Sequence, residues 1–436
     1  QKRHPGLELL PATGINIPGR SMDTQPLMQI AGDVSPDVIY VNFRQSDTYI
    51  RNKFLYPLDR YIEKTAGAEI ENGYLLDTQE YYDAISAGSN FDEAMRERMP
   101  RIVWDVIRRE CPYGAECPYV KEWGGPAAER HSHVWAVPQN QLVIALFYRK
   151  DLFAEAGLPD RVPDNVNEMM DWARRITNYD DNTFGLSVPT SELGWTTLGF
   201  LYSYGGRAVS QDEDGVWRCV FDSEEAVDAY TFVARLFLEP YTNRFGSYSG
   251  TVGSNAQNMP GAKYAMWFAY LDQRAFESVD PATVGFGPVP KGPSGMRGSE
   301  YNCMMHGLYA GNVDNNPEIR DLAWDYVWFY GGEEANALYA RTYVENGLGR
   351  FVRPSVLRKA GYHDEAESVP AGWEDAYASA LEVGVPEPYG RNCQLVYTYM
   401  SRGIDQILND GEVKSLLREG GDIGEVRSRV KDILEY

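Results

Sequence analysis

The chain has 436 residues, which is enough for two domains that each bury an apolar core. Its formal net charge of −22 argues against nucleic acid as a partner and against binding to an anionic membrane surface. The longest apolar run, 142–148, is far shorter than the ~20 residues of a membrane-spanning helix. The composition is therefore that of a globular protein that binds neither nucleic acid nor membrane.

Aromatic residues are abundant, with 30 Tyr and 10 Trp. Both side chains combine a flat apolar face with a polar tip. Such residues suit carbohydrate, because the C–H faces of a sugar stack on rings while its hydroxyl groups need hydrogen-bond partners. Core packing accounts for most of these rings in any globular protein.

Short β-branched runs alternate with amphipathic helices, which is the pattern of an α/β fold. The segment 36–43 predicts a buried strand, followed by a loop and then helices. Three later helices are predicted to begin at the capping residues Asn165, Asp222 and Asn316. We expect the third of these helices to end at Gly331.

An irregular segment, 95–133, reads as an insertion. Within it, Cys111 and Cys117 flank a short loop that could close as a local disulfide in an oxidising compartment. The alternative is a metal site completed by His131 and His133, although zinc usually takes cysteines two to four residues apart. We therefore expect no resident metal. The remaining cysteines are expected to be small buried side chains: Cys219, Cys303 and Cys393.

Sequence motifs of common enzymes are absent from the chain, including phosphate-binding loops, the dinucleotide fingerprint and H-E-x-x-H. The segment 246–250 resembles a nucleophile elbow but has Tyr248 at its centre. Five histidines leave few bases for a Ser–His or Cys–His mechanism. We expect no catalytic residue and no cofactor, and a facing pair of carboxylates in a glycoside-active enzyme is the main enzymatic alternative.

Seven segments, in order, resemble the family 1 extracellular solute-binding proteins, which are maltose-binding-protein-like sugar receptors of ABC importers. They include a Pro-Asp-Val strand, a Tyr-x-Lys-Asp-Leu-Phe stretch followed by Ala-Gly-Leu-Pro, and a Gly-Phe-Gly-Pro-Val-Pro stretch. Each segment alone is degenerate, but seven in the right order form a strong signal. The segments are 35–62, 135–160, 198–209, 259–274, 284–295, 321–340 and 344–358.

The resemblance implies a two-lobed periplasmic-binding-protein-like fold of type II, with crossing strands between lobes and a ligand cleft. It places residues 1–145 and 286–334 in the N-terminal lobe and residues 146–285 and 335–436 in the C-terminal lobe. The family pattern begins with a further strand and helix, so we expect this first βα unit to be missing here.

The resemblance also implies a function. The expected protein is a monomeric extracytoplasmic receptor, periplasmic and with or without a lipid anchor, that captures a sugar by hinge closure and delivers it to ABC transporter permease subunits. A polyamine or another small solute is the alternative ligand, because aromatic rings and acids also form cation cages.

By the same resemblance, the first lobe contributes the loop after its Pro-Asp-Val strand, and the crossing segment contributes amides beside the hinge. Arg44 could bind hydroxyl or acid groups through its guanidinium. The residues expected to contact ligand in these two segments are Asn42, Phe43, Arg44, Gln45, Gln139, Asn140 and Gln141.

The second lobe is expected to contribute a stacking aromatic, Trp195, with Glu192 near it. Tyr301 and Asn302 are expected on the strand that returns to the first lobe, while His306 there is expected in the core. The remaining expected ligand contacts are Trp267, Tyr270, Asp272, Tyr397 and Tyr399.

Overall fold

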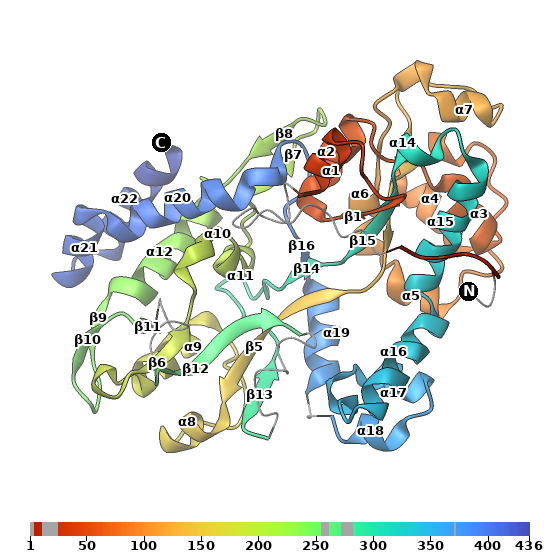
Figure 1. The fold of residues 1–436 in the computed structure, drawn as a ribbon. Helices are drawn as coiled ribbons and strands as arrows, with labels where there is room; N and C mark the ends of the chain where they lie inside the picture. The colour runs from red at the N-terminus through yellow and green to blue at the C-terminus, as the bar shows by residue number, and fades with distance from the viewer. Residues whose placement is uncertain (1–3, 11–24, 254–260, 272–281, 370–371) are drawn as a thin grey trace. The chain divides into compact units, whose positions relative to one another are not determined.

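The structure is a computed structural model that describes residues 4–10, 25–253, 261–271, 282–369 and 372–436. The chain divides into two compact units (Figure 1). Unit 1 comprises residues 1–140 and 303–333, and unit 2 comprises residues 141–302 and 334–436. None of the helices in the described ranges has both the length and the apolar character needed to span a bilayer.

Unit 1 is built on a three-stranded antiparallel sheet in the order β1-β15-β4. The strands are β1 (Val38–Val41), β15 (Met305–Leu308) and β4 (Val137–Pro138). The register pairs Ile39 with Gly307 and Met305 with Pro138. A separate hairpin joins β2 (Arg108–Glu110) to β3 (Ser132–Val134).

The helices of unit 1 surround buried residues that include Val41, Phe43, Tyr49 and Trp104. Their bounds are α1 (Gln25–Ala31), α2 (Phe43–Arg51), α3 (Asp59–Ala66), α4 (Thr78–Ser86), α5 (Glu93–Arg98), α6 (Arg101–Ile107), α7 (Pro118–Glu122), α14 (Ala310–Val313) and α15 (Pro317–Tyr330).

Unit 2 contains a mixed sheet in the order β11-β6-β12-β5-β14-β16, with β13 also paired to β5. The strand β5 spans Leu142–Arg149 and pairs antiparallel with β12, β13 and β14. Figure 1 shows β5, β12 and β13 side by side. The other strands of this sheet are β6 (Thr183–Ser187), β11 (Val252–Gly253), β12 (Lys263–Tyr270), β13 (Val284–Gly287), β14 (Glu300–Asn302) and β16 (Val385–Pro386).

Two small hairpins and a set of helices complete unit 2. The hairpins join β7 (Val209–Gln211) to β8 (Trp217–Cys219) and β9 (Pro240–Thr242) to β10 (Ser247–Ser249). The helices are α8 (Lys150–Glu155), α9 (Val166–Ile176), α10 (Leu193–Thr196), α11 (Leu198–Ser203), α12 (Glu224–Leu238), α16 (Glu333–Glu345), α17 (Pro354–Lys359), α18 (His363–Glu367), α19 (Trp373–Val383), α20 (Val396–Asn409), α21 (Gly411–Arg418) and α22 (Ile423–Glu435).

The division into units differs from the boundaries predicted from the sequence. The chain passes between units after residues 140, 302 and 333, whereas the prediction placed the changes after 145, 285 and 334. The largest difference concerns residues 286–302, which lie in unit 2. The reason is strand pairing, because both β13 and β14 hydrogen-bond to β5.

Two of the three predicted helix starts are confirmed. The side chain of Asn165 caps α9, and that of Asn316 caps α15, which ends before Gly331. The prediction that Asp222 caps the next helix is wrong. The cap of α12 is Ser223, whose hydroxyl accepts from the backbone N–H of Ala226 at 3.3 Å.

The predicted loop after the first strand is also wrong. Helix α2 begins directly at Phe43, because Asn42 caps it by accepting from the backbone N–H of Gln45 at 2.8 Å. Among the cysteines, Cys303 and Cys393 are buried as predicted, but Cys219 is exposed. Cys219 ends the strand β8 of a two-stranded hairpin whose residues are largely exposed or half-buried.

Candidate functional site

A buried carboxylate, Glu300, is the centre of a polar and aromatic cluster in unit 2. Its Oε2 atom accepts from Trp195 Nε1 at 2.9 Å and from the Tyr270 hydroxyl at 3.1 Å. The rings of Trp195 and Tyr270 lie 5.6 Å apart. Glu300 itself is fully buried, while Trp195, Tyr270 and Tyr397 are half-buried. Part of each ring therefore stays accessible above a buried acid.

A second buried carboxylate, Glu387, is joined to the first through Tyr397. The Tyr397 hydroxyl lies 3.2 Å from Glu300 Oε1 and 3.0 Å from Glu387 Oε1. The amide of Asn302 donates to Glu387 Oε2 at 3.0 Å. We call these six residues the acid–aromatic cluster: Trp195, Tyr270, Glu300, Asn302, Glu387 and Tyr397.

The cluster forms because of strand alternation and sheet register. Side chains of a strand point to opposite faces in turn, so Glu300 and Asn302 share one face of β14 while Tyr301 faces the other. Tyr301 is fully buried and pairs with Val143 on β5 and with Pro386 on β16. The backbone N–H of Glu387 donates to the carbonyl of Tyr301 at 2.9 Å, which brings the second acid beside β14.

The surroundings of Glu300 raise its pKa and favour the neutral acid. Burial is the main cause and the nearby charge of Glu387 is the second, and together they raise the pKa of Glu300 to about 8. Hydrogen bonds from Trp195, Tyr270 and Tyr397 oppose the shift. The acid is thus held neutral beside another buried carboxylate.

The donors indicate where this proton lies. Trp195 and Tyr270 both donate to Oε2 of Glu300, which leaves Oε1, the oxygen that faces Tyr397, as the position for a proton in the neutral acid. The Tyr397 hydroxyl has one hydrogen and donates to one carboxylate only. If Glu300 donates its proton to the Tyr397 hydroxyl and Tyr397 donates to Glu387, then all three groups have a hydrogen-bond partner.

The residues predicted at the end of the first strand lie at the start of helix α2 in unit 1. Asn42 and Gln45 are buried and are used inside the unit, Asn42 as the cap and Gln45 as acceptor from Tyr49 at 3.1 Å. Phe43 is fully buried in the core, and Arg44 is half-buried.

The predicted crossing segment coincides with the passage between units after Asn140. The Gln139 amide is buried and donates to the carbonyls of Val137 and Val327 in unit 1. The exposed Asn140 accepts from the backbone N–H of Met304 at 3.2 Å. In unit 2, Gln141 accepts from the Tyr377 hydroxyl at 2.5 Å.

Of the residues predicted in the second lobe, the structure brings Trp195, Tyr270, Asn302 and Tyr397 into one cluster. It does not bring the exposed Glu192 or Tyr399 into that cluster, since Tyr399 is 62% exposed on α20. Trp267 stacks on Phe147 with ring centres 5.8 Å apart. Asp272 lies outside the described residues.

Two further predictions concern the strands around the second crossing. Tyr301 and Asn302 were expected with the first lobe, but they belong to unit 2 through β14. His306 is on β15 of unit 1, half-buried, with its ring edge-on to Tyr330 at 5.5 Å. Burial lowers the pKa of His306 to about 4, which keeps this imidazole neutral.

Sequence reasoning missed both buried acids. Glu300 directly precedes Tyr301, and Glu387 lies in a Pro-Glu-Pro-Tyr stretch. Acids are abundant in this chain, and Glu300 and Glu387 are 87 positions apart, so nothing in the sequence pairs them. The one available signal was position, since Glu300 shares a strand face with the predicted contact Asn302.

Unit 1 holds a smaller charged group that the sequence did not single out. Asp47 is buried on α2 and forms ion pairs with Arg109 at 3.1 Å and with Arg51 at 2.9 Å. Arg109 lies on β2, so these pairs connect the hairpin of the insertion to the helix that carries Arg44.

The sequence profile of the family described as bacterial extracellular solute-binding protein matches residues 12–337. A protein of Escherichia coli (strain K12), named as the ABC transporter periplasmic-binding protein YcjN, is 25% identical over 232 residues. That match covers 52% of this chain and 50% of the relative, so the chain matches about half the length of that protein.

Solved structures extend the likeness to nearly the whole chain. The sugar-binding protein MalE from Xanthomonas citri has a TM-score of 0.59 at 17% identity, covering 94% of this chain and 86% of its own. UgpB from Mycobacterium tuberculosis, in complex with glycerophosphocholine, has a TM-score of 0.58 at 16% identity, with 95% and 86% covered. At these identities the likeness shows the fold, which is that of type II periplasmic-binding proteins.

Proposed function

Because this chain belongs to the family of bacterial extracellular solute-binding proteins, we propose that it is the receptor subunit of an ABC importer for a sugar or sugar-derived solute. It works outside the cytoplasm and delivers its ligand to the permease subunits of the importer. The family and the structural neighbours are receptors and not enzymes. The paired acids Glu300 and Glu387 therefore serve binding rather than hydrolysis.

The acid–aromatic cluster is the main observation that supports a carbohydrate ligand. Half-buried rings of Trp195, Tyr270 and Tyr397 present apolar faces next to hydrogen-bonding groups, which is the combination that a sugar ring requires. The rings are held in place by hydrogen bonds to Glu300, so little rotamer freedom is lost when a ligand stacks on them.

A cationic solute is the second candidate, favoured by the charge of this cluster. Two buried acids beside aromatic rings also suit an ammonium group. The raised pKa of Glu300 weakens this case at neutral pH, because it lowers the negative charge that the cluster offers to a cation. Binding of an amine would ionise Glu300, so affinity for amines should rise with pH, while affinity for a neutral sugar should not.

A thermal-shift screen of sugars, polyols and amines tests the proposal. A true ligand at a hundredfold excess over its Kd stabilises the folded protein by about 2.7 kcal/mol. We expect Trp195→Ala to weaken the ligand found in this way by roughly 10- to 100-fold, the effect of losing ~1.4–2.8 kcal/mol of ring contact. Titration calorimetry measures that loss.

The matched control for this variant is Tyr399→Ala, which removes an exposed ring from the same unit and should leave affinity unchanged. Equal losses in both variants would contradict the assignment of the cluster as the binding surface. A response to amines alone would replace the sugar by the second candidate. The absence of a response to every class would refute both.

We also propose that the two units move relative to each other when ligand binds, as in hinge-bending receptors. The chain passes between the units three times, after residues 140, 302 and 333, which allows hinge motion without breaking either core. Small-angle X-ray scattering should show a smaller radius of gyration at saturating ligand. An unchanged radius with a ligand bound would contradict hinge closure.

A further inference from the structure

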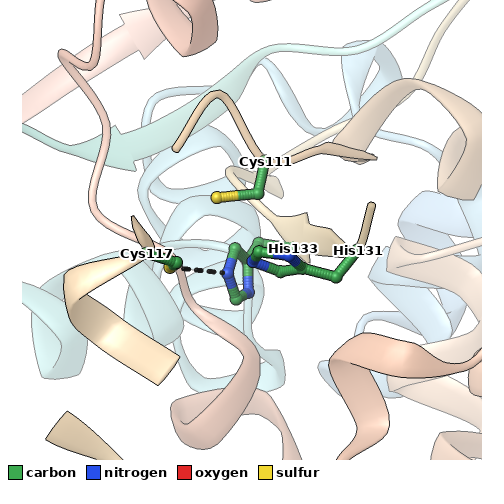
Figure 2. A group of neighbouring side chains, drawn as sticks. All are labelled: Cys111, Cys117, His131 and His133. Atoms are coloured by element: carbon green, nitrogen blue, oxygen red, sulfur yellow. Dashed lines mark hydrogen bonds between the residues drawn. The ribbon is translucent and has the colours of Figure 1, made fainter. Parts of the chain in front are cut away.

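Four buried metal-ligating side chains converge in unit 1, in the insertion. Cys111, Cys117, His131 and His133 each offer a ligand atom, and these atoms all lie within 4.8 Å of one another. Cys117 and His133 are fully buried, and Cys111 and His131 are each 5% exposed. Figure 2 shows the two sulfur atoms and two imidazole rings gathered around one point.

Both imidazoles are oriented by hydrogen bonds that use their Nδ1 atoms. His133 Nδ1 lies 3.0 Å from Oδ2 of the buried Asp59, and His131 Nδ1 lies 2.9 Å from the carbonyl of Ala128. Since both partners are acceptors, each Nδ1 donates to its partner, and in the neutral imidazole that metal binding requires, the lone pair lies on Nε2. This orientation by a carboxylate or carbonyl is typical of metal-bound histidine.

The freed Nε2 atoms face the sulfur atoms. His133 Nε2 lies 3.6 Å from Cys117 Sγ, as Figure 2 shows. His131 Nε2 is buried and has no hydrogen-bond partner among the residues that the structure describes. A buried acceptor without a partner costs about 1–3 kcal/mol. A bound metal ion would explain why His131 Nε2 is buried without a hydrogen bond.

Local backbone structure explains why these four residues meet. His131 and His133 are two residues apart at and beside β3, so their side chains share one face of the hairpin. The backbone N–H of Cys111 donates to the carbonyl of His131 at 2.8 Å, which sets Cys111 opposite His131. The turn 112–116 then returns the chain to Cys117 at the start of α7.

The separation of one sulfur and one nitrogen atom suits a tetrahedral zinc ion. Zn–S bonds of about 2.3 Å and Zn–N bonds of about 2.0–2.1 Å place a sulfur and a nitrogen ligand about 3.6 Å apart. The measured separation of Cys117 Sγ and His133 Nε2 has that value. Two thiolates would also balance the two positive charges of zinc, so the metal with its four ligands would carry no net charge.

We propose that Cys111, Cys117, His131 and His133 form a structural zinc site. Zinc displaces one proton from each thiol and takes the lone pairs of the two Nε2 atoms, with no change in oxidation state. All four positions of the metal are then filled by protein, so the site holds structure rather than catalysing a reaction. It fastens both ends of the 111–131 segment to the β2–β3 hairpin.

The sequence argued against this site because five residues separate the cysteines, more than zinc motifs usually allow. The structure removes that objection. Gly114 has a φ of +52°, a backbone conformation open to glycine, and it lets the intervening residues form a compact turn. The cysteine side chains therefore meet despite their spacing.

The decisive experiment uses the full chain purified without chelator from an oxidising compartment. Plasma mass spectrometry should find one equivalent of zinc per chain. Cobalt(II) added to the reduced, metal-free protein should give the intense visible bands of tetrahedral cobalt and a thiolate-to-cobalt charge-transfer band. Asp59→Asn should keep this spectrum but bind zinc about 10- to 100-fold more weakly, because it loosens the orientation of His133.

Variants separate a metal site from general damage to the fold. Cys117→Ser should lose stoichiometric zinc, whereas Cys219→Ser and His363→Asn, at exposed positions, should keep it. Chelator should lower the Tm of the wild-type protein and leave that of Cys117→Ser unchanged. A Cys111–Cys117 disulfide without zinc in the purified protein, a metal other than zinc, or an octahedral cobalt spectrum would each overturn the proposal.

Discussion

Replacing Glu300 by Gln is expected to make unit 2 more stable at high pH, with a difference from wild type that grows as pH rises. Burial and the nearby charge of Glu387 raise the pKa of Glu300 in the folded protein to about 8, whereas the pKa of a glutamate in an unfolded chain is ~4.3. Between these values the folded state binds more protons than the unfolded state. The free energy of unfolding of the wild type therefore falls as pH rises through this window and levels off above it.

Glutamine has the shape of the neutral acid and does not titrate, so the variant lacks this decline. Its carbonyl can accept from Trp195 and Tyr270, and its amide can donate to Tyr397. Relative to wild type, the variant should gain about 3 to 5 kcal/mol between pH 4 and pH 9. Urea unfolding at several pH values measures this difference.

The control for this prediction is Glu192→Gln, which changes an exposed glutamate of the same unit. Its unfolding free energy should follow that of wild type at every pH. If the curves of Glu300→Gln and wild type also run parallel, then Glu300 does not hold its proton. The hydrogen-bonded chain through Tyr397 to Glu387 would then be wrong.

Replacing Gly298 by Ala is expected to cost about 2 to 4 kcal/mol of stability. A Cβ atom at this position would lie 2.2 Å from the backbone nitrogen of Ser203 and 2.4 Å from the backbone oxygen of Gly199. Both atoms belong to helix α11, so no side-chain rotation can relieve the clash. A Cβ atom at Gly292 would likewise lie 1.9 Å from the carbonyl oxygen of Ser203.

The clash should also displace Glu300 and so disturb the acid–aromatic cluster, because Gly298 lies only two residues before Glu300. Chemical denaturation measures the loss of stability, and titration of the ligand measures the loss of affinity. Gly411→Ala is the control, since a Cβ there meets nothing within 4 Å and the residue begins α21. That variant should be unchanged or stabilised by up to ~1 kcal/mol. Similar destabilisation by both substitutions would show that close approach at Gly298 is not the cause.

Local patterns in the sequence predicted the elements that depend on neighbours in the chain. The caps of α9 and α15 were predicted because Asn165 and Asn316 act on backbone N–H groups only two or three residues away. The cap of α12 was placed one residue early, since Asp222 and Ser223 are equally good capping types. Ordered family segments predicted the α/β class and the receptor fold, which the family match and the structural likeness show.

By itself, then, the sequence determined the fold class and the family, and it predicted as ligand contacts four residues that the structure places in the acid–aromatic cluster, namely Trp195, Tyr270, Asn302 and Tyr397. Only the tertiary structure brought Glu300 and Glu387 together and placed Cys111, Cys117, His131 and His133 around one point. Strand register determines which distant side chains lie close together, and register depends on pairing between residues far apart in the sequence. Spacing along the sequence carries no record of those pairings.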